Sequence, residues 1–84
     1  MSVFEELIDP KIVKVFHVLS ANKGKYFHLQ KISRTANVPI STTFRIVKKL
    51  VKIGLIDQIN IDKTKLYRIA DNKKVAELKG VLER

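Results

Sequence analysis

The sequence predicts one mostly helical α+β domain, with a three-helix core and a small antiparallel sheet. Eighty-four residues suffice for a single core, and 45% of them are apolar, which argues against disorder. Apolar residues recur at helical spacing in four segments, and strand-forming residues flank one polar break. The expected order is helix, strand, helix, helix, strand, hairpin tip, strand, helix. Within a single domain of residues 1–84 we expect an N-terminal arm or short helix at 1–9, two helices joined by a turn at 29–53, a hairpin at 55–70 and a C-terminal helix at 71–84.

The first long helix is predicted at residues 10–21. Asp9 is suited to cap its first turn, and Pro10 suits the first helical position because proline has no amide hydrogen to satisfy. The apolar arc of this helix is wider than one core face needs. Two interpretations are open: the helix is nearly central in the fold, or part of it meets a second subunit. Gly24 is placed to adopt a left-handed conformation after the helix.

The central feature is a pair of helices at 29–36 and 39–53, joined through Asn37 and Val38 and preceded by a brief strand at 26–29. The second helix has an inward face with the expected three-to-four spacing, at Thr43, Val47, Leu50 and Gly54. At about 100° per residue, the opposite face carries a hydroxyl and cations, with a ring and a lysine on its flanks. These outward residues are Ser41, Arg45, Lys48 and Lys52, flanked by Phe44 and Lys49.

A hairpin follows the two helices. Residues 55–61 and 66–70 are rich in strand formers, and the polar run 62–65 between them suits a hairpin tip. Asp71 is expected to cap the last helix. The apolar residues of that helix share one face: Val75, Leu78 and Leu82.

The charges are unevenly placed. Seventeen Lys and Arg against eight acids give a net charge of +9, yet no acid lies between Pro10 and Ile56. A solvated surface usually mixes both signs, so this acid-free block indicates a polyanion partner. The alternative is a lysine-rich surface adapted to heat, but heat adaptation enriches Glu together with Lys.

Other kinds of site find little support in the sequence. There is no cysteine, and no apolar stretch approaches the roughly 20 residues of a membrane span. His17 and His28 have no carboxylate or thiol at ligand spacing, so we expect no metal and no cofactor. No Gly-rich phosphate loop or Ser/His/Asp set suggests an enzyme. The acidic N-terminus argues against a signal peptide, so we expect a cytoplasmic protein, with no evident small-molecule effector and no membrane partner.

The segment from Val38 to Arg45, followed by Val47, Leu50 and Gly54-Leu55-Ile56, resembles the pattern of winged helix-turn-helix transcription regulators, particularly the ArsR-like and IclR-like groups. In those proteins a V-[SP]-x-S-T turn opens the recognition helix. An aromatic-Arg pair follows, then two leucine-like core positions, and GL[IV] opens the wing. The resemblance covers nearly the whole chain in element order.

This resemblance implies a sequence-specific regulator that binds double-stranded DNA, with residues 39–53 in the major groove and the wing tip at 62–65 on the backbone or minor groove.

Two residues depart from the family pattern. Thr43 stands where an aliphatic residue is usual, so its hydroxyl needs a partner, and we expect a carbonyl one turn back. Asn37 stands where Gly is common, and Asn is the next-best residue for the positive φ that the turn requires.

The expected DNA contacts follow from the outward faces and from the resemblance. Arg45 is the first candidate, because its guanidinium can pair with guanine or clamp a phosphate. Ile40 can meet a thymine methyl group, and Thr42 is equally suited to capping the helix. Phe44 either packs along the sugar-phosphate backbone or lies in the core beneath the wing. The full set is Gln30, Lys31, Arg34, Ile40, Ser41, Thr42, Phe44, Arg45, Lys48, Lys49, Lys52, Lys63, Lys65 and Arg68.

One recognition helix reads only about four or five base pairs, which is too few for selectivity in a genome. We therefore expect a homodimer on a pseudo-palindromic site. Its expected interface is Phe4, Leu7, Val13, Val15, Val75, Leu78 and Leu82. Alternatively, the last helix covers the core of its own domain. Two other functions are also open: a winged helix used as an interaction or assembly module of a transcription or replication complex, and a protein that coats DNA without sequence preference.

Overall fold

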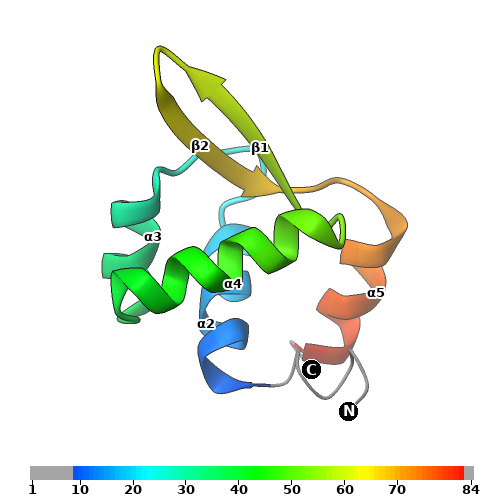
Figure 1. Ribbon diagram of the computed structural model, residues 1–84. Helices are drawn as coiled ribbons and strands as arrows, with labels where there is room; N and C mark the ends of the chain where they lie inside the picture. Colours follow the sequence, from blue (N-terminus) through cyan, green and yellow to red (C-terminus); the bar gives the residue numbers. More distant parts are fainter. Residues whose placement is uncertain (1–8, 83–84) are drawn as a thin grey trace.

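The computed structural model describes residues 9–82, which form four helices and a two-stranded antiparallel sheet (Figure 1). The predicted class, mostly helical α+β with a three-helix core, is confirmed. The expectations for residues 1–8, including the interface residues Phe4 and Leu7, lie outside the described residues. The elements are α2 (Pro10–Ser20), α3 (Leu29–Ala36), α4 (Ile40–Lys52), β1 (Ile56–Ile61), β2 (Thr64–Ile69) and α5 (Lys73–Leu82).

Both ends of α2 are capped by side chains. The Asp9 carboxylate accepts a hydrogen bond from the Lys11 amide at 2.8 Å, as the sequence predicts for this cap. At the other end, the Asn22 side-chain amide donates to the Val18 carbonyl oxygen at 2.8 Å, and Gly24 adopts a φ of 85°. These contacts satisfy main-chain groups that a helix end leaves unpaired.

The core lies where α2 packs against α3 and α4. Val15 and Leu19 of α2, Ile32 of α3 and Leu50 of α4 are all 0% exposed. Burying each of these side chains contributes about 1.5–3 kcal/mol relative to leaving it in water. The first interpretation of the wide apolar arc is therefore correct: α2 is central. The expectation that Val15 lies in a dimer interface is wrong, because the core encloses its side chain completely.

The hairpin of β1 and β2 extends away from the helical core (Figure 1). Its turn consists of Asp62 and Lys63, which both have positive φ, 47° and 68°. A type I′ turn requires positive φ at both central residues, and its twist matches that of the strands. The predicted tip at 62–65 is therefore too long, because Thr64 and Lys65 already belong to β2.

The brief strand predicted at 26–29 is reduced to a single bridge. Phe27 and Tyr67 exchange main-chain hydrogen bonds of 2.7 and 2.8 Å. The next residue, His28, already serves α3, since its Nδ1 accepts a hydrogen bond from the Lys31 amide at 3.2 Å. The bridge ties the segment before α3 to the wing.

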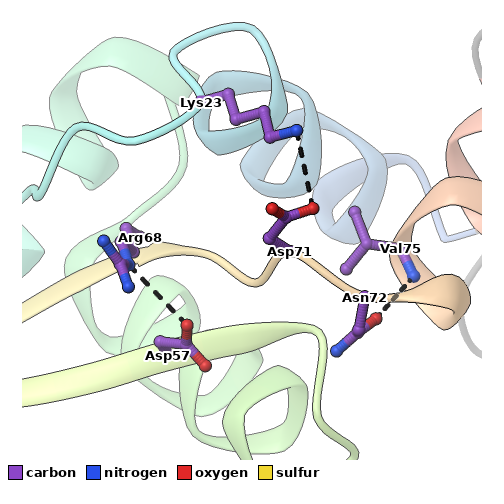
Figure 2. Close-up of polar contacts among 6 residues, drawn as sticks. All are labelled: Lys23, Asp57, Arg68, Asp71, Asn72 and Val75. Carbon is purple, nitrogen blue, oxygen red and sulfur yellow. Dashed lines mark hydrogen bonds and ion pairs between the residues drawn. The ribbon is translucent and has the colours of Figure 1, made fainter.

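The last helix, α5, begins later than predicted, and Asn72 rather than Asp71 caps it. The Asn72 side-chain oxygen accepts from the Val75 amide at 3.0 Å (Figure 2), and its NH₂ group donates to the Gly54 carbonyl oxygen at 2.8 Å. Asp71 instead lies 3.5 Å from Lys23 Nζ (Figure 2). Asn72 thus fixes the start of α5 to the turn that follows α4.

The apolar side of α5 covers its own domain. Val75 is buried, and Leu78 and Leu82 are half-buried against the core. The expectation that Val75 belongs to a dimer interface is therefore wrong, while Leu78 and Leu82 keep only part of their surface for a partner. Val81, near the end of the helix, is 44% exposed.

Candidate nucleic-acid interface

The turn between α3 and α4 is held by hydroxyl groups. Asn37 adopts the left-handed conformation, with φ 56° and ψ 47°, as its place in the turn predicts. The Ser33 and Thr43 hydroxyls lie 2.6 and 3.2 Å from the Val38 carbonyl oxygen. The Thr43 hydroxyl also lies 3.0 Å from the Pro39 carbonyl oxygen, so the predicted partner one turn back is confirmed. The turn that orients α4 is therefore fixed from inside the domain.

Helix α4 has one buried and one exposed face, as its spacing predicts. The buried residues are Thr43, Ile46, Val47 and Leu50. The exposed residues opposite them are Ser41, Arg45, Lys48 and Lys52. Because the core holds the apolar side, the cations and the hydroxyl point to solvent. Their contact with DNA stays a prediction.

Two large apolar side chains, Ile40 and Phe44, also stand on the exposed side of α4. They are 46% and 42% exposed. The Lys48 Nζ lies 5.6 Å from the centre of the Phe44 ring, within the range of a cation–π contact. Of the two interpretations of Phe44, the one that places it in the core beneath the wing is wrong.

A hollow of about 480 Å³ lies between the wing tip and the beginnings of α3 and α4; we call it the wing-side hollow. Ile40 and Phe44 line it together with Gln30, and Lys63 and Lys65 line it from the wing. Both lysines are exposed. The fold therefore brings the wing tip and the first two turns of α4 to one surface.

A second hollow, of about 360 Å³, lies on the other flank of α4 against the start of α2; we call it the α2-side hollow. Lys11, Arg45 and Lys49 line it together with Thr42. Asp9 borders it too, with its carboxylate bonded to the Lys11 amide. Lys11 is absent from the contacts expected from sequence, because its place beside Arg45 depends on how α2 packs against α4.

The remaining expected contacts fall into two groups: Arg68 interacts within the sheet, whereas three residues of α3 are exposed. Arg68 is held on the sheet: its Nε lies 3.7 Å from the Asp57 carboxylate (Figure 2), and its guanidinium carbon lies 4.8 Å from the centre of the Tyr26 ring. It lines neither hollow, so its candidacy for DNA is weakened. Three other expected contacts are exposed on α3: Gln30, Lys31 and Arg34.

Neither a metal site nor a membrane span finds support in the described part of the chain. No group of three or more His, Cys, Asp or Glu residues within 9–82 could hold a metal ion. None of the helices in this range is long and apolar enough to cross a membrane. The His28 side chain caps α3 by accepting a hydrogen bond from the Lys31 amide.

The two-helix motif with its fixed turn, followed by a basic hairpin beside the start of the second helix, defines a winged helix-turn-helix DNA-binding protein. The chain belongs to the IclR helix-turn-helix domain family, whose model matches residues 11–60. This match runs from α2 through nearly all of β1. The family and the fold are those of DNA-binding transcriptional regulators, not of enzymes.

Solved structures share this fold. One is a predicted DNA-binding transcriptional regulator from E. coli (21% identity, 96% of this chain and 82% of that chain, TM-score 0.75). Another is the antimony-specific transcriptional repressor AntR (14% identity, 95% and 67%, TM-score 0.75). A third is the homodimeric winged helix-turn-helix DNA-binding domain of Mb0332 from Mycobacterium bovis (18% identity, 96% and 71%, TM-score 0.73). No curated protein sequence matches the chain.

Proposed function

We propose that the protein regulates transcription by binding specific sequences in double-stranded DNA, with α4 in the major groove and the wing tip on the backbone or minor groove. The observation that carries this proposal is the exposed, acid-free face of α4. On it, Arg45, Lys48 and Lys52 accompany the Ser41 hydroxyl. The major groove admits an α-helix and presents acceptor atoms of guanine that an arginine can pair with. The lysines are suited to phosphates, which position a protein on the duplex.

The two hollows support the same placement. Phosphate strands border the major groove on both sides, and cations flank α4 on both sides. Lys63 and Lys65 lie on the wing side, and Lys11 and Lys49 on the α2 side. A helix lying in the groove therefore meets complementary charge along both edges.

The test is a binding titration on random-sequence duplex DNA at two salt concentrations. Affinity should fall steeply as salt rises, because each phosphate contact releases counterions. The double variant Arg45→Ala plus Lys48→Ala should weaken binding with an unchanged melting temperature, because both side chains are exposed. Lys73→Ala plus Lys79→Ala removes the same charge from exposed positions on α5 and is the matched control, expected to bind more tightly than the first pair.

The same experiment separates the competing functions. Absent or salt-insensitive binding would contradict the proposal and favour a protein-interaction module. Selection of bound sequences from a random pool then tests specificity. If the selected sequences bind no tighter than random DNA, the protein coats DNA instead of reading it.

We also propose that the regulator binds as a homodimer. One α4 covers only about four or five base pairs, and the M. bovis domain of the same fold is described as homodimeric. With Val15 and Val75 assigned to the core, the expected interface residues within 9–82 that keep surface for a partner are the half-buried Val13, Leu78 and Leu82, and the exposed Val81 adds to them. Exposed apolar residues at the end of a helix suit a two-fold contact, in which the same patch meets its copy.

Sedimentation at increasing protein concentration tests this proposal. The wild-type chain should shift from monomer to dimer, and Val81→Glu should abolish the shift by placing a charge in the contact. Ala76→Glu puts the same charge at an exposed α5 position on a different face and should leave the dimer intact. A wild-type chain that stays monomeric with and without its DNA site would contradict the homodimer.

A further inference from the structure

Ile40 and Phe44 form an apolar pair on the surface that the proposed function turns toward DNA. They are one helical turn apart, so their side chains share a face of α4. Among residues 9–82, large hydrophobic side chains stand exposed at four positions, Ile40, Phe44, Ile61 and Val81, and α4 carries two of them. The apolar pair therefore borders the cationic and polar face of α4 on the side of the wing.

Within residues 9–82, the core is complete without this apolar pair. The core side of α4 is already complete, with Thr43 and Leu50 at 0% exposure and Val47 at 1%. Exposing large apolar side chains to water is unfavourable, by roughly 25 cal/mol for each Å² that burial would remove. A partner that covers both side chains would recover that free energy.

The surroundings of the apolar pair limit what that partner can be. The pair lines the wing-side hollow, where Lys63 and Lys65 stand opposite, and Lys48 Nζ lies over the Phe44 ring. The covering surface must therefore be apolar at its centre and anionic at its edge. In the major groove the anionic edge is the phosphate strand, and the apolar group on a base edge is the C5-methyl of thymine.

We propose that Ile40 and Phe44 read thymine by packing against its C5-methyl group in the major groove. This inference rests on the proposed function and makes it more specific: the preferred sites carry thymine where the first two turns of α4 enter the groove. Arg45, farther around the helix, remains available for guanine or phosphate.

Uracil provides a direct test, because a deoxyuridine–adenine pair keeps the hydrogen-bonding groups of a thymine–adenine pair and lacks only the methyl. Two duplexes of one alternating A·T sequence, one with thymine and one with deoxyuridine throughout, are titrated with the wild-type chain at a fixed salt concentration. We expect the thymine duplex to bind tighter by about fourfold for each methyl that the apolar pair covers.

The double variant Ile40→Ala plus Phe44→Ala should bind both duplexes equally. Both positions are exposed, so its melting temperature should stay close to that of the wild type. Lys52→Gln is the control on the cationic face of the same helix: it should weaken binding to both duplexes and keep their affinity ratio.

Three results would overturn the inference. The first is that the wild-type affinities for the two duplexes agree within twofold. The second is that the difference in affinity between the duplexes persists in the double variant, which would attribute that difference to DNA shape. The third is that Phe44→Ala weakens binding to both duplexes equally, which would place the ring against the sugar-phosphate backbone. In each case, salt-dependent binding to duplex DNA would leave the proposed function standing, whereas its absence would remove both.

Discussion

The Thr43 hydroxyl lies 3.2 Å from the main-chain carbonyl oxygen of Val38, inside the domain at the turn before α4. The Ser33 hydroxyl lies 2.6 Å from the same oxygen. This oxygen is therefore within reach of a hydroxyl from each of the two helices that the turn connects, and the single Thr43 hydroxyl proton is shared between it and the Pro39 carbonyl oxygen at 3.0 Å. This arrangement explains why the chain tolerates Thr at a core position that is 0% exposed.

Single replacements of the two donors should have small effects, and the double replacement a larger one. Thr43→Val or Ser33→Ala alone should change the free energy of unfolding by less than about 1 kcal/mol, because the other hydroxyl still reaches the Val38 oxygen and the Pro39 oxygen keeps its hydrogen bond from the Thr43 amide at 2.9 Å. Together they should cost about 1 kcal/mol more than the sum, because the buried oxygen then loses both hydroxyl donors. Urea unfolding of the four proteins measures this coupling, and strict additivity would contradict it.

Much of this fold could be predicted because local chemistry decides it. The Asp9 cap and the positive φ of Asn37 depend on residues within a few positions in the chain. The exposure of Arg45 and Lys48 follows from helical spacing alone. Each of these predictions needs only one element and its ends.

The start of α5 could not be predicted, since Asp71 and Asn72 are adjacent and both are good caps. Asn72 is selected by a distant contact: its NH₂ group reaches the Gly54 carbonyl oxygen at 2.8 Å, which a carboxylate cannot do as a donor. Asn72→Ala should therefore lower the free energy of unfolding by about 1–2 kcal/mol.

Asp71→Ala is the matched control for the Asn72 substitution. Asp71 pairs with Lys23 across 3.5 Å, but their side chains are 86% and 66% exposed. The loss of this surface pair should change the free energy of unfolding by less than about 0.5 kcal/mol. Thermal or urea unfolding ranks the two variants, and a larger effect at Asp71 would contradict the assignment of the cap.

Alkaline pH should destabilise the protein through Tyr67. Burial raises the pKa of the Tyr67 hydroxyl above its ordinary value of 10.0. Between the unfolded and the folded pKa, the folded state therefore holds more protons than the unfolded state, so stability falls as pH rises through that window. Below a pH of about 10 this group contributes no pH dependence.

Melting temperatures recorded from about pH 8 to about pH 11 at constant ionic strength measure this effect. Tyr67→Phe should remove part of the alkaline loss, because the buried hydroxyl with the raised pKa is then absent. Equal alkaline slopes for wild type and Tyr67→Phe would contradict the prediction.

The face proposed for a second subunit was the least predictable part of the molecule. Apolar residues at helical spacing look the same whether they face a core or a second subunit, so Val15 and Val75 could not be distinguished from surface residues. The same limit applies to Lys11, whose position beside Arg45 depends on tertiary packing. Periodicity indicates which residues share a face and leaves open what that face meets.

Lys11 should contribute a phosphate contact if DNA lies along α4 as proposed. It lines the α2-side hollow with Arg45 and Lys49, where the strand opposite the wing would pass. Lys11→Gln should weaken binding to duplex DNA and reduce the slope of log affinity against log salt by about one. Lys14→Gln removes the same charge from an exposed position on the same helix that does not line the hollow, and it should leave the slope nearly unchanged. Equal slopes for the two variants would show that Lys11 acts only through net charge, and the DNA would then have to be placed without the α2-side hollow.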